Sequence, residues 1–402
     1  MTAISDEPAT PYPFGIPERL SMHPKLAEVR KNTPVLRIAM PYGGDAWLAT
    51  RYDDVKMVLA DPRFSMAALV GKDVPRALPN ITYESTIQTM DPPEHGRLRR
   101  LATRAFTVRR VEALRPRIHK ILDDLIDAML ISGSPADLAT SVSWPMPITV
   151  ICEMLGVPVA DQGRFREWTD KVLAITGDGS EALASRDHLR QYFAGLVAAH
   201  RDEPQDDLLS DLITARDVDD RLSEDELITL AEALLVGGHE TTANQIGNFV
   251  YLLLANHDLW EALVADSGLI PAAVEELLRY IPLTAGAANV RIAKEDLVLA
   301  SGHPIAAGDA VLASIASANH DELVYDRAEE IDLHRTEKNQ HVGFGHGAHH
   351  CLGAPLARME LQMALARLAN RVPTLRLAVP AEDVEWRADR FVRGVRSLPV
   401  AW

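Results

Sequence analysis

Apolar residues recur with helical spacing through most of this chain. In the stretch from residue 107 to residue 131 they stand at Val111, Leu114, Ile118, Ile121, Leu122, Leu125, Ile126 and Met129. Steps of three and four place such residues on one face of a helix. The same pattern predicts further helices at Tyr52–Ala60, Pro147–Leu155, Asp161–Ile175, Ser185–His200, Leu208–Ala215, Glu224–Ala255 and Ala272–Tyr280.

Strand-like runs are few and short. Val35–Ala39 and Ala46–Thr50 flank a Pro-Tyr-Gly-Gly turn, which predicts a hairpin. Further strands are expected only within Leu297–Ile315 and near the C-terminal end. The pattern therefore predicts a mainly α fold with small β-sheets.

No low-complexity linker, internal repeat or shift in composition divides the 402 residues. We therefore expect a single domain over residues 14–402, preceded by a polar, acidic and disordered segment at residues 1–13. The formal net charge of −16 argues against nucleic acid or an anionic membrane as a partner. Because no apolar run reaches 18 residues, we also expect no membrane span and a cytoplasmic location.

Cys351 lies in the glycine-rich stretch Phe344–Gly353, directly before residues that favour a helix. A thiol at that place faces backbone N–H groups and the positive end of the helix dipole, which favour the thiolate. A lone cysteine is ordinarily a small buried hydrophobe. That reading suits Cys152, which stands in an apolar helical run.

The helix expected at Glu224–Ala255 carries a second candidate site. Gly237 and Gly238 stand in its middle, and each costs ~1 kcal/mol relative to alanine. They allow either close packing on another helix or space for a ligand. An acid and a hydroxyl follow at Glu240 and Thr241. We interpret the intervening His239 as a surface or inter-helix residue and not as a metal ligand.

These two segments resemble the haem-ligand loop and the oxygen-activation helix of the cytochrome P-450 superfamily. The resemblance runs from about Pro34 to the C-terminus. The matching loop residues are Phe344, Gly345, Gly347, His349, Cys351, Gly353, Leu356 and Ala357. It implies the single-domain P-450 fold, with haem b held between the long helix and the cysteine loop. It also implies that the Cys351 thiolate binds the haem iron and favours O–O cleavage.

The resemblance further implies roles for individual residues. His95 and Arg99 share a helix face, which alone suits a solvated surface, but they match an element that binds haem propionates. The other implied haem contacts are Arg291, Phe344, His349 and Gly238. Thr241 and Glu240 would hydrogen-bond the dioxygen and deliver protons. The implied substrate contacts are Ala233, Val236, Gly237, Ala287, Ala288, Phe391 and Val392.

Glu276 and Arg279 match a buried structural pair of the family. A third arm of that network usually comes from an arginine before the cysteine loop. Counting along the sequence puts this position at Glu330, with Arg327 three residues earlier. The third arm therefore stays open.

The resemblance predicts a monooxygenase that inserts one oxygen atom from O₂ into a small apolar organic substrate, by hydroxylation or epoxidation. NAD(P)H-derived electrons would arrive through a ferredoxin and its reductase, in secondary-metabolite tailoring or in catabolism. Two alternatives remain: a peroxide-driven haem-thiolate enzyme, against which Glu240 and Thr241 argue, and a non-enzymatic haem sensor or gas carrier.

Eight arginines and one acid, Glu112, stand between residues 97 and 117, against the charge of the whole chain. They either form a solvated face balanced by nearby acids or bind an acidic ferredoxin. The residues proposed for that docking face are Arg100, Arg104 and Arg109.

Overall fold

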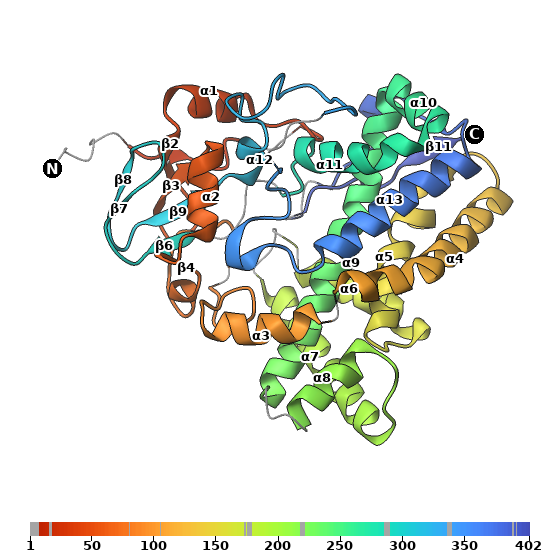
Figure 1. Cartoon of the computed structure of the whole chain (residues 1–402), viewed down its shortest axis with the longest axis horizontal. Coiled ribbons are helices and arrows are strands. Elements are labelled where there is room, and N and C mark those ends of the chain that lie inside the picture. The colour runs from red at the N-terminus through yellow and green to blue at the C-terminus, as the bar shows by residue number, and fades with distance from the viewer. Residues whose placement is uncertain are drawn as a thin grey trace. The chain divides into compact units, whose positions relative to one another are not determined.

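The computed structural model describes residues 8–15, 18–79, 81–104, 106–172, 174, 179–217, 222–284, 290–335, 340–387, 390 and 392–402 (Figure 1). Backbone contacts divide the chain into two compact units. We call Met1–Pro92, Thr284–Glu330 and Glu337–His350 the sheet unit. The helical unit comprises Pro93–Leu283, Ile331–Thr336 and Cys351–Trp402.

The sheet unit contains a six-stranded sheet with strand order β1-β2-β3-β9-β6-β4. Its strands are β1 Thr10–Pro11, β2 Val35–Ala39, β3 Asp45–Ala49, β4 Phe64–Ser65, β6 Arg291–Ala293 and β9 Ala310–Ala313. β2 and β3 form the predicted antiparallel hairpin, in which Leu36 lies opposite Leu48. A separate pair joins β7 Leu297–Val298 to β8 Pro304–Ile305.

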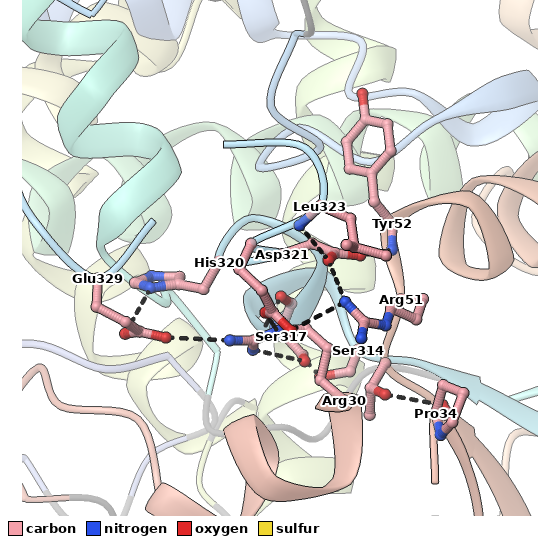
Figure 2. A network of polar contacts seen from close by, with 12 residues as sticks. Arg30, Pro34, Arg51, Tyr52, Ser314, Ser317, His320, Asp321, Leu323 and Glu329 are labelled. Atoms are coloured by element: carbon pink, nitrogen blue, oxygen red, sulfur yellow. Dashed lines mark hydrogen bonds and ion pairs between the residues drawn. The ribbon is translucent and has the colours of Figure 1, made fainter. Parts of the chain in front are cut away.

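Three α-helices accompany this sheet: α1 Pro24–Asn32, α2 Tyr52–Ala60 and α12 Ile315–Ala318. Short 3₁₀ turns lie at Ala67–Leu69 and Gly347–His349. Buried Arg30 of α1 donates to the Glu322 carboxylate at 2.8 Å and to that of Glu329 at 3.1 Å. Figure 2 shows Arg30 reaching toward Ser317 and Glu329, so ionic contacts hold α1 against the chain that follows α12.

The helical unit holds the remaining long helices. They are α3 Glu94–Thr103, α4 Val108–Ser132, α5 Pro145–Met154, α6 Gln162–Val172, α7 Ser180–Asp202, α8 Leu208–Asp217, α9 Glu224–Ala255, α10 His257–Ala265, α11 Ile270–Tyr280 and α13 Ala354–Arg371. A π-helical turn at Ala139–Ser143 precedes α5. Strands β5 Ala136–Asp137, β10 Arg376–Leu377 and β11 Pro399–Ala401 form a three-stranded sheet in the order β10-β11-β5.

α9 is the central helix of this unit. It packs against α5, α7 and α13, and in Figure 1 it is the long green helix beside blue α13. Ser223 caps its start, because its hydroxyl accepts from the Glu226 amide while the Glu226 carboxylate accepts from the Ser223 amide. Most of its side chains from Leu227 onward are buried. Burial on several sides makes α9 a rigid support for the residues at its middle.

The predicted mainly α fold with small sheets is confirmed. α2 and α9 have the expected bounds, and α4 differs from its prediction by one residue at each end. α1 and α10 were not predicted. Within the segment expected to be disordered, residues 1–7 lie outside the described ranges and Thr10–Pro11 pairs with β2. The single domain over residues 14–402 stays a prediction.

No helix in the described ranges combines the length and the apolar character needed to cross a membrane.

Candidate active site

Cys351 lies directly before α13, as the sequence predicts. The backbone N–H groups of Gly353 and Ala354 donate to its sulfur. Cys351 is exposed, yet burial is the largest influence on it and raises the pKa of its thiol, whereas Arg99 and Arg358 lower it. Cys351 is thus partly accessible, while protein atoms crowd the rest of its surroundings. Cys152, by contrast, is fully buried, and burial raises its pKa to about 12, so the expected core thiol is confirmed.

The loop before Cys351 belongs to the sheet unit and depends on two left-handed glycines. Gly345 and Gly347 have φ angles of +74° and +72°. A Cβ atom on Gly347 would lie 2.6 Å from the Cα atom of Ala60, at the end of α2. Only glycine therefore allows this approach. Half-buried Phe344 and His349 lie in the same loop, with His349 in the 3₁₀ turn.

Arg291 is a buried cation of the sheet unit, at the start of β6. Burial lowers the pKa of its guanidinium, and Asp91 opposes this effect. Asp91 itself accepts from the Met66 amide at 2.8 Å and from the Ser65 hydroxyl at 2.5 Å. Within the described residues, no carboxylate lies at ion-pair distance from Arg291. A buried guanidinium in this condition suits an anionic ligand such as a haem propionate.

α3 places His95 and Arg99 on one face, as expected from their spacing. His95 is buried and Arg99 is partly exposed. Burial lowers the pKa of Arg99, whereas the charge of Cys351 raises it. The structure therefore brings Arg99 and the Cys351 thiol into one electrostatic environment.

The two adjacent glycines of α9 have different surroundings. A Cβ atom on Gly238 would lie 2.9 Å from Cγ1 of Ile151 in α5, so this glycine permits close helix packing. A Cβ atom on Gly237 would meet nothing within 4 Å. The close-packing reading therefore holds for Gly238, whereas space for a ligand beside Gly237 stays a prediction. The assignment of Gly238 to the haem stays a prediction.

An accessible stripe interrupts the otherwise buried surface of α9. It comprises Ala233, Val236, Gly237 and Thr241, which are partly or wholly exposed. The Thr241 hydroxyl donates to the Gly237 carbonyl oxygen at 3.0 Å. Small side chains and one hydroxyl are therefore accessible along this stripe of α9.

Glu240, next to Thr241, is fully buried. Neither of its carboxylate oxygens has a hydrogen-bond partner in the described part of the chain. Burial, and then the negative charge of Asp170, raises its pKa to about 7, while Arg387, Arg390 and Arg166 lower it. An acid that titrates near neutrality can give and regain a proton at working pH.

His239 is buried between α9 and α6. Its Nδ1 lies 3.0 Å from the Leu235 carbonyl oxygen, and its Nε2 lies 3.5 Å from the Thr169 hydroxyl. The inter-helix alternative is therefore correct and the surface alternative is wrong. Across the described ranges, no group of three or more His, Cys, Asp or Glu side chains could hold a metal ion.

The chain is closely similar to known bacterial enzymes over nearly its whole length. It is 48% identical to nocardicin C N-oxygenase of Nocardia uniformis subsp. tsuyamanensis, covering 97% of this chain and 98% of that protein. It is 46% identical to mycinamicin IV hydroxylase/epoxidase of Micromonospora griseorubida, covering 97% and 98%. The sequence model of the family described as Cytochrome P450 matches residues 180–372. This chain belongs to the cytochrome P450 family.

A solved structure of a relative supports the fold. The LnmA cytochrome P450 hydroxylase from the leinamycin biosynthetic pathway of Streptomyces atroolivaceus S-140 aligns with a TM-score of 0.91 and 48% identity. The alignment covers 98% of this chain and 100% of that one. The protein is therefore an oxidoreductase of the P450 monooxygenase class, whose prosthetic group is haem.

The residues described above fit haem chemically. Cys351 offers a sulfur that accepts two backbone N–H groups, and Arg99 lies close enough to influence it. Arg291 offers a buried positive charge for an acidic group. Of the expected substrate contacts, Ala287, Ala288 and Phe391 lie outside the described residues, and Val392 is buried.

In this P450 the third arm of the Glu276–Arg279 network is Arg335. Glu276 accepts from Nε and Nη2 of Arg279, both at 2.8 Å, and from Nε of Arg335 at 2.9 Å. The positions suggested by counting were wrong, because exposed Arg327 instead pairs with Glu330 at 3.2 Å. The backbone amide of Asp332, three residues before Arg335, also donates to the Glu276 carboxylate.

The arginine-rich segment separates into paired and unpaired residues. Arg97 pairs with Glu226, Arg110 with Asp211, Arg115 with Glu112, and Arg117 with Glu153. The solvated, balanced face is therefore correct for these four. The structure gives Arg100, Arg104 and Arg109 no ion-pair partner among the residues it describes, and all three are exposed. A cleft of about 670 Å³ is lined by Arg97, Arg100, Leu101, Arg104, Leu222, Ser223 and Glu226.

The sequence analysis missed three contributors to the site, and a sequence signal could have found only one of them. Arg335 could have been found by continuing the count to the next arginine. Asp170 and Arg387, both near Glu240, are 217 residues apart and match no motif used in the sequence analysis. Only the folded chain brings them together.

Proposed function

We propose that this P450 inserts one oxygen atom from O₂ into a small apolar organic substrate, by hydroxylation or epoxidation, during tailoring of a secondary metabolite. Electrons come from NAD(P)H through a ferredoxin and its reductase. The observation that carries the proposal is the juxtaposition on α9 of a buried, titratable acid at Glu240 with an accessible hydroxyl at Thr241. Nocardicin C and mycinamicin IV, named as substrates of two relatives, support tailoring over catabolism.

Haem, when bound, supplies an iron centre at which O₂ is reduced and its O–O bond is cleaved. Cys351 would hold the iron through its sulfur, and Phe344 would pack beside that sulfur. The propionates would meet His95, Arg99, Arg291 and His349. Cationic and hydrogen-bonding side chains suit carboxylates at all four of these positions.

The chain's own residues manage protons and space. Glu240 holds a proton near neutral pH because burial disfavours its charged form. Thr241, one residue later, has an accessible hydroxyl that can donate a hydrogen bond to the reacting centre. Ala233, Val236 and Gly237 leave room for a substrate beside it. The proposed contacts from elsewhere in the chain are Ala287, Ala288, Phe391 and Val392.

Reconstitution with a surrogate ferredoxin and reductase tests this function. We expect NAD(P)H consumption coupled to formation of an oxygenated product. Thr241→Ala should bind substrate nearly as the parent does, while peroxide release rises and product per NAD(P)H falls. Unaltered coupling in Thr241→Ala would remove the proton-relay assignment. Turnover supported only by hydrogen peroxide would favour a peroxygenase, and reductant left unconsumed would favour a haem sensor.

The iron ligand is tested separately by the ferrous–CO spectrum. The parent should show the red-shifted Soret band of thiolate ligation, and Cys351→Ala should lose it. A mutant that keeps this band would have its ligand elsewhere. Cys152→Ala is the matched control, because Cys152 is buried and its thiol is not expected to reach the haem.

We further propose that Arg100, Arg104 and Arg109 bind the acidic ferredoxin. Two of them line the arginine-bearing cleft, and in the described residues none is neutralised by an ion pair. Complementary charge mainly raises the association rate, and salt screens it. Changing the three to glutamate should slow reduction by ferredoxin and leave dithionite reduction and substrate binding intact.

The chain offers a matched control for that docking experiment. Arg110, Arg115 and Arg117 stand in the same segment but are each engaged in an ion pair. The same triple change to glutamate there alters net charge equally and should slow ferredoxin reduction much less. Equal effects of both triple variants, or a rate insensitive to ionic strength, would rule out this docking face.

A further inference from the structure

Arg387 stands between two carboxylates of the helical unit. Its Nη1 lies 3.6 Å from Oε1 of Glu240, and its two terminal nitrogens each lie 3.3 Å from an oxygen of Asp170. The exposed fraction of the side chain rises from 1% at Glu240 through 10% at Arg387 to 25% at Asp170. The three residues therefore form a charged series that leads from a buried acid toward the surface.

Arg387 is held firmly in this position. Its guanidinium lies 4.4 Å from the ring centroid of buried Trp144, where cation–π attraction stabilises it. Arg166 of α6 lies 5.0 Å from the same ring. The Arg387 amide donates to the Gly394 carbonyl oxygen at 2.9 Å. A fixed cation of this kind does not move to neutralise one carboxylate fully.

The charged groups that influence Glu240 come from two neighbouring elements. Asp170 and Arg166 come from α6, and Arg387 and Arg390 come from the C-terminal segment. Burial has the largest influence and favours the protonated acid; among the charges, Asp170 favours it too, and the three arginines favour the carboxylate. Glu360 of α13, whose pKa is lowered in part by the Thr242 side chain, is not among the groups that shift the pKa of Glu240. Asp170 and Arg387 thus act on Glu240 in opposite directions.

We propose that Arg387, shared between Asp170 and Glu240, is the positioning residue that keeps Glu240 able both to release and to regain a proton. The inference rests on the proposed proton-relay function of Glu240. A cation bound only to Glu240 would hold it as a carboxylate, and burial without a cation would hold it as a neutral acid. When one guanidinium is shared between two carboxylates, Glu240 is held in neither form and can exchange its proton.

The proton balance of this arrangement is simple. Glu240 breaks its O–H bond, gives one proton toward Thr241 and becomes a carboxylate, which Arg387 then stabilises. Arg387 keeps its own protons throughout, because a guanidinium does not deprotonate in proteins. The replacement proton comes from solvent water, and Asp170 is the more exposed acid of the series.

The inference is tested by removing the positive charge of Arg387 and, in a separate variant, the negative charge of Asp170. The readout is the infrared band of the protonated Glu240 carboxyl in the resting holoenzyme, identified by its loss in Glu240→Gln and titrated against pH. Arg387→Met should move the titration upward by about one pH unit or more, since an opposite charge has been removed. Asp170→Asn should move it downward, because a like charge disappears and Arg387 becomes free to serve Glu240. Arg387→Lys should remain near the parent.

Two controls on α6 carry the same charge changes away from Glu240. Arg164→Met and Glu167→Gln alter exposed residues that pair with Asp161 and Lys171, and they should leave the titration in place. Shifts of Arg387→Met and Asp170→Asn in one direction, or no shift in either, would overturn the proposal. If Arg387→Met does not fold, the downward shift in Asp170→Asn decides alone.

Failure of the relay itself would look different. If Glu240→Gln leaves product per NAD(P)H unchanged, Glu240 does not supply the catalytic proton, whatever the infrared titration shows. Glu240→Gln could instead uncouple the enzyme while Arg387→Met and Asp170→Asn leave the titration of Glu240 in place. In that case the relay stands and the assignment of Arg387 fails.

Discussion

Two buried glutamates of the helical unit have opposite surroundings. Glu276 accepts hydrogen bonds from Arg279, Arg335 and the Asp332 amide, all between 2.8 and 2.9 Å. The oxygens of Glu240 accept none in the described part of the chain, and Arg387 lies at 3.6 Å. Residue type and burial are nearly the same, whereas the number of donors differs.

This difference separates a charge that fixes the chain from an acid that titrates near neutrality. Burying a carboxylate is costly unless donors replace the lost water. Glu276 has its donors and ties α11 to residues 332 and 335, so it fixes the chain. Glu240 lacks them, and its pKa rises to about 7. An acid that must exchange protons has to be left partly unsatisfied, at a cost to stability.

Glu360 of α13 completes the comparison. It is buried, neither of its oxygens has a hydrogen-bond partner within the described ranges, and burial raises its pKa well above the usual value. The Thr242 hydroxyl opposes that shift only in part. No arginine is among the groups that shift the pKa of Glu360, whereas Arg387 is among those that shift the pKa of Glu240. The three glutamates thus range from one with several donors, through one beside a shared arginine, to one whose pKa no arginine shifts.

The largest effect should follow from breaking the satisfied site. Glu276→Gln leaves two buried arginines without their shared carboxylate, and we expect a loss of about 3–5 kcal/mol in the free energy of unfolding. Urea unfolding of the holoprotein measures it. Glu275→Gln is the matched control, because the neighbouring Glu275 pairs with Arg358 at a partly exposed position and should lose less than about 1 kcal/mol. Equal losses in both variants would mean that burial of the network adds nothing.

The second effect has the opposite sign and depends on pH. The pKa of Glu240 is raised in the folded protein, so the folded state binds more protons than the unfolded state between pH 4.5 and about 7. Stability contributed by this group therefore falls as the pH rises through that window and is lowest above it. Glu240→Gln should match the parent near pH 5 and exceed it by about 3 kcal/mol near pH 8.

Unfolding midpoints in urea at the two pH values check this prediction. Glu167→Gln, an exposed change of the same kind on α6, should show no such dependence on pH. A Glu240→Gln variant that is less stable than the parent at pH 8 would show that the carboxylate is better satisfied than its contacts indicate.

The smallest effect sharpens the assignment of the third arm. Arg335→Met removes one of three donors from Glu276 and should cost about 1–3 kcal/mol. Arg327→Met removes an exposed ion pair with Glu330 and should cost less than about 1 kcal/mol. Thermal unfolding of the two variants side by side distinguishes them. The reverse order would argue against Arg335 as the third arm.

The sequence predicted those parts of the molecule whose stability is local. α2, α9 and the β2–β3 hairpin have strong periodicity, a good N-cap or a glycine turn, and their bounds were correct or within a residue. α1 was missed because its anchor is ionic: Arg30 contacts residues about 290 positions away. Periodicity does not report such contacts.

The candidate site divides in the same way. Motif residues such as Cys351, Glu240 and Thr241 could be named from sequence because their spacing along the chain is fixed. Asp170 and Arg387 could not, because their contacts depend on how distant segments fold together. The two readings of Gly237 and Gly238 also needed the structure, since only the position of Ile151 tells them apart.

Glu226 has a consequence for how this chain can change during evolution. Its carboxylate both caps the start of α9, through the Ser223 amide, and pairs with Arg97 of α3. One side chain thus joins the helix that carries Glu240 to the helix that carries His95. Glutamine would retain a cap without the charge, and aspartate is one methylene shorter. Substitution at position 226 is therefore expected to persist in a lineage only alongside compensating changes at positions 97 and 223.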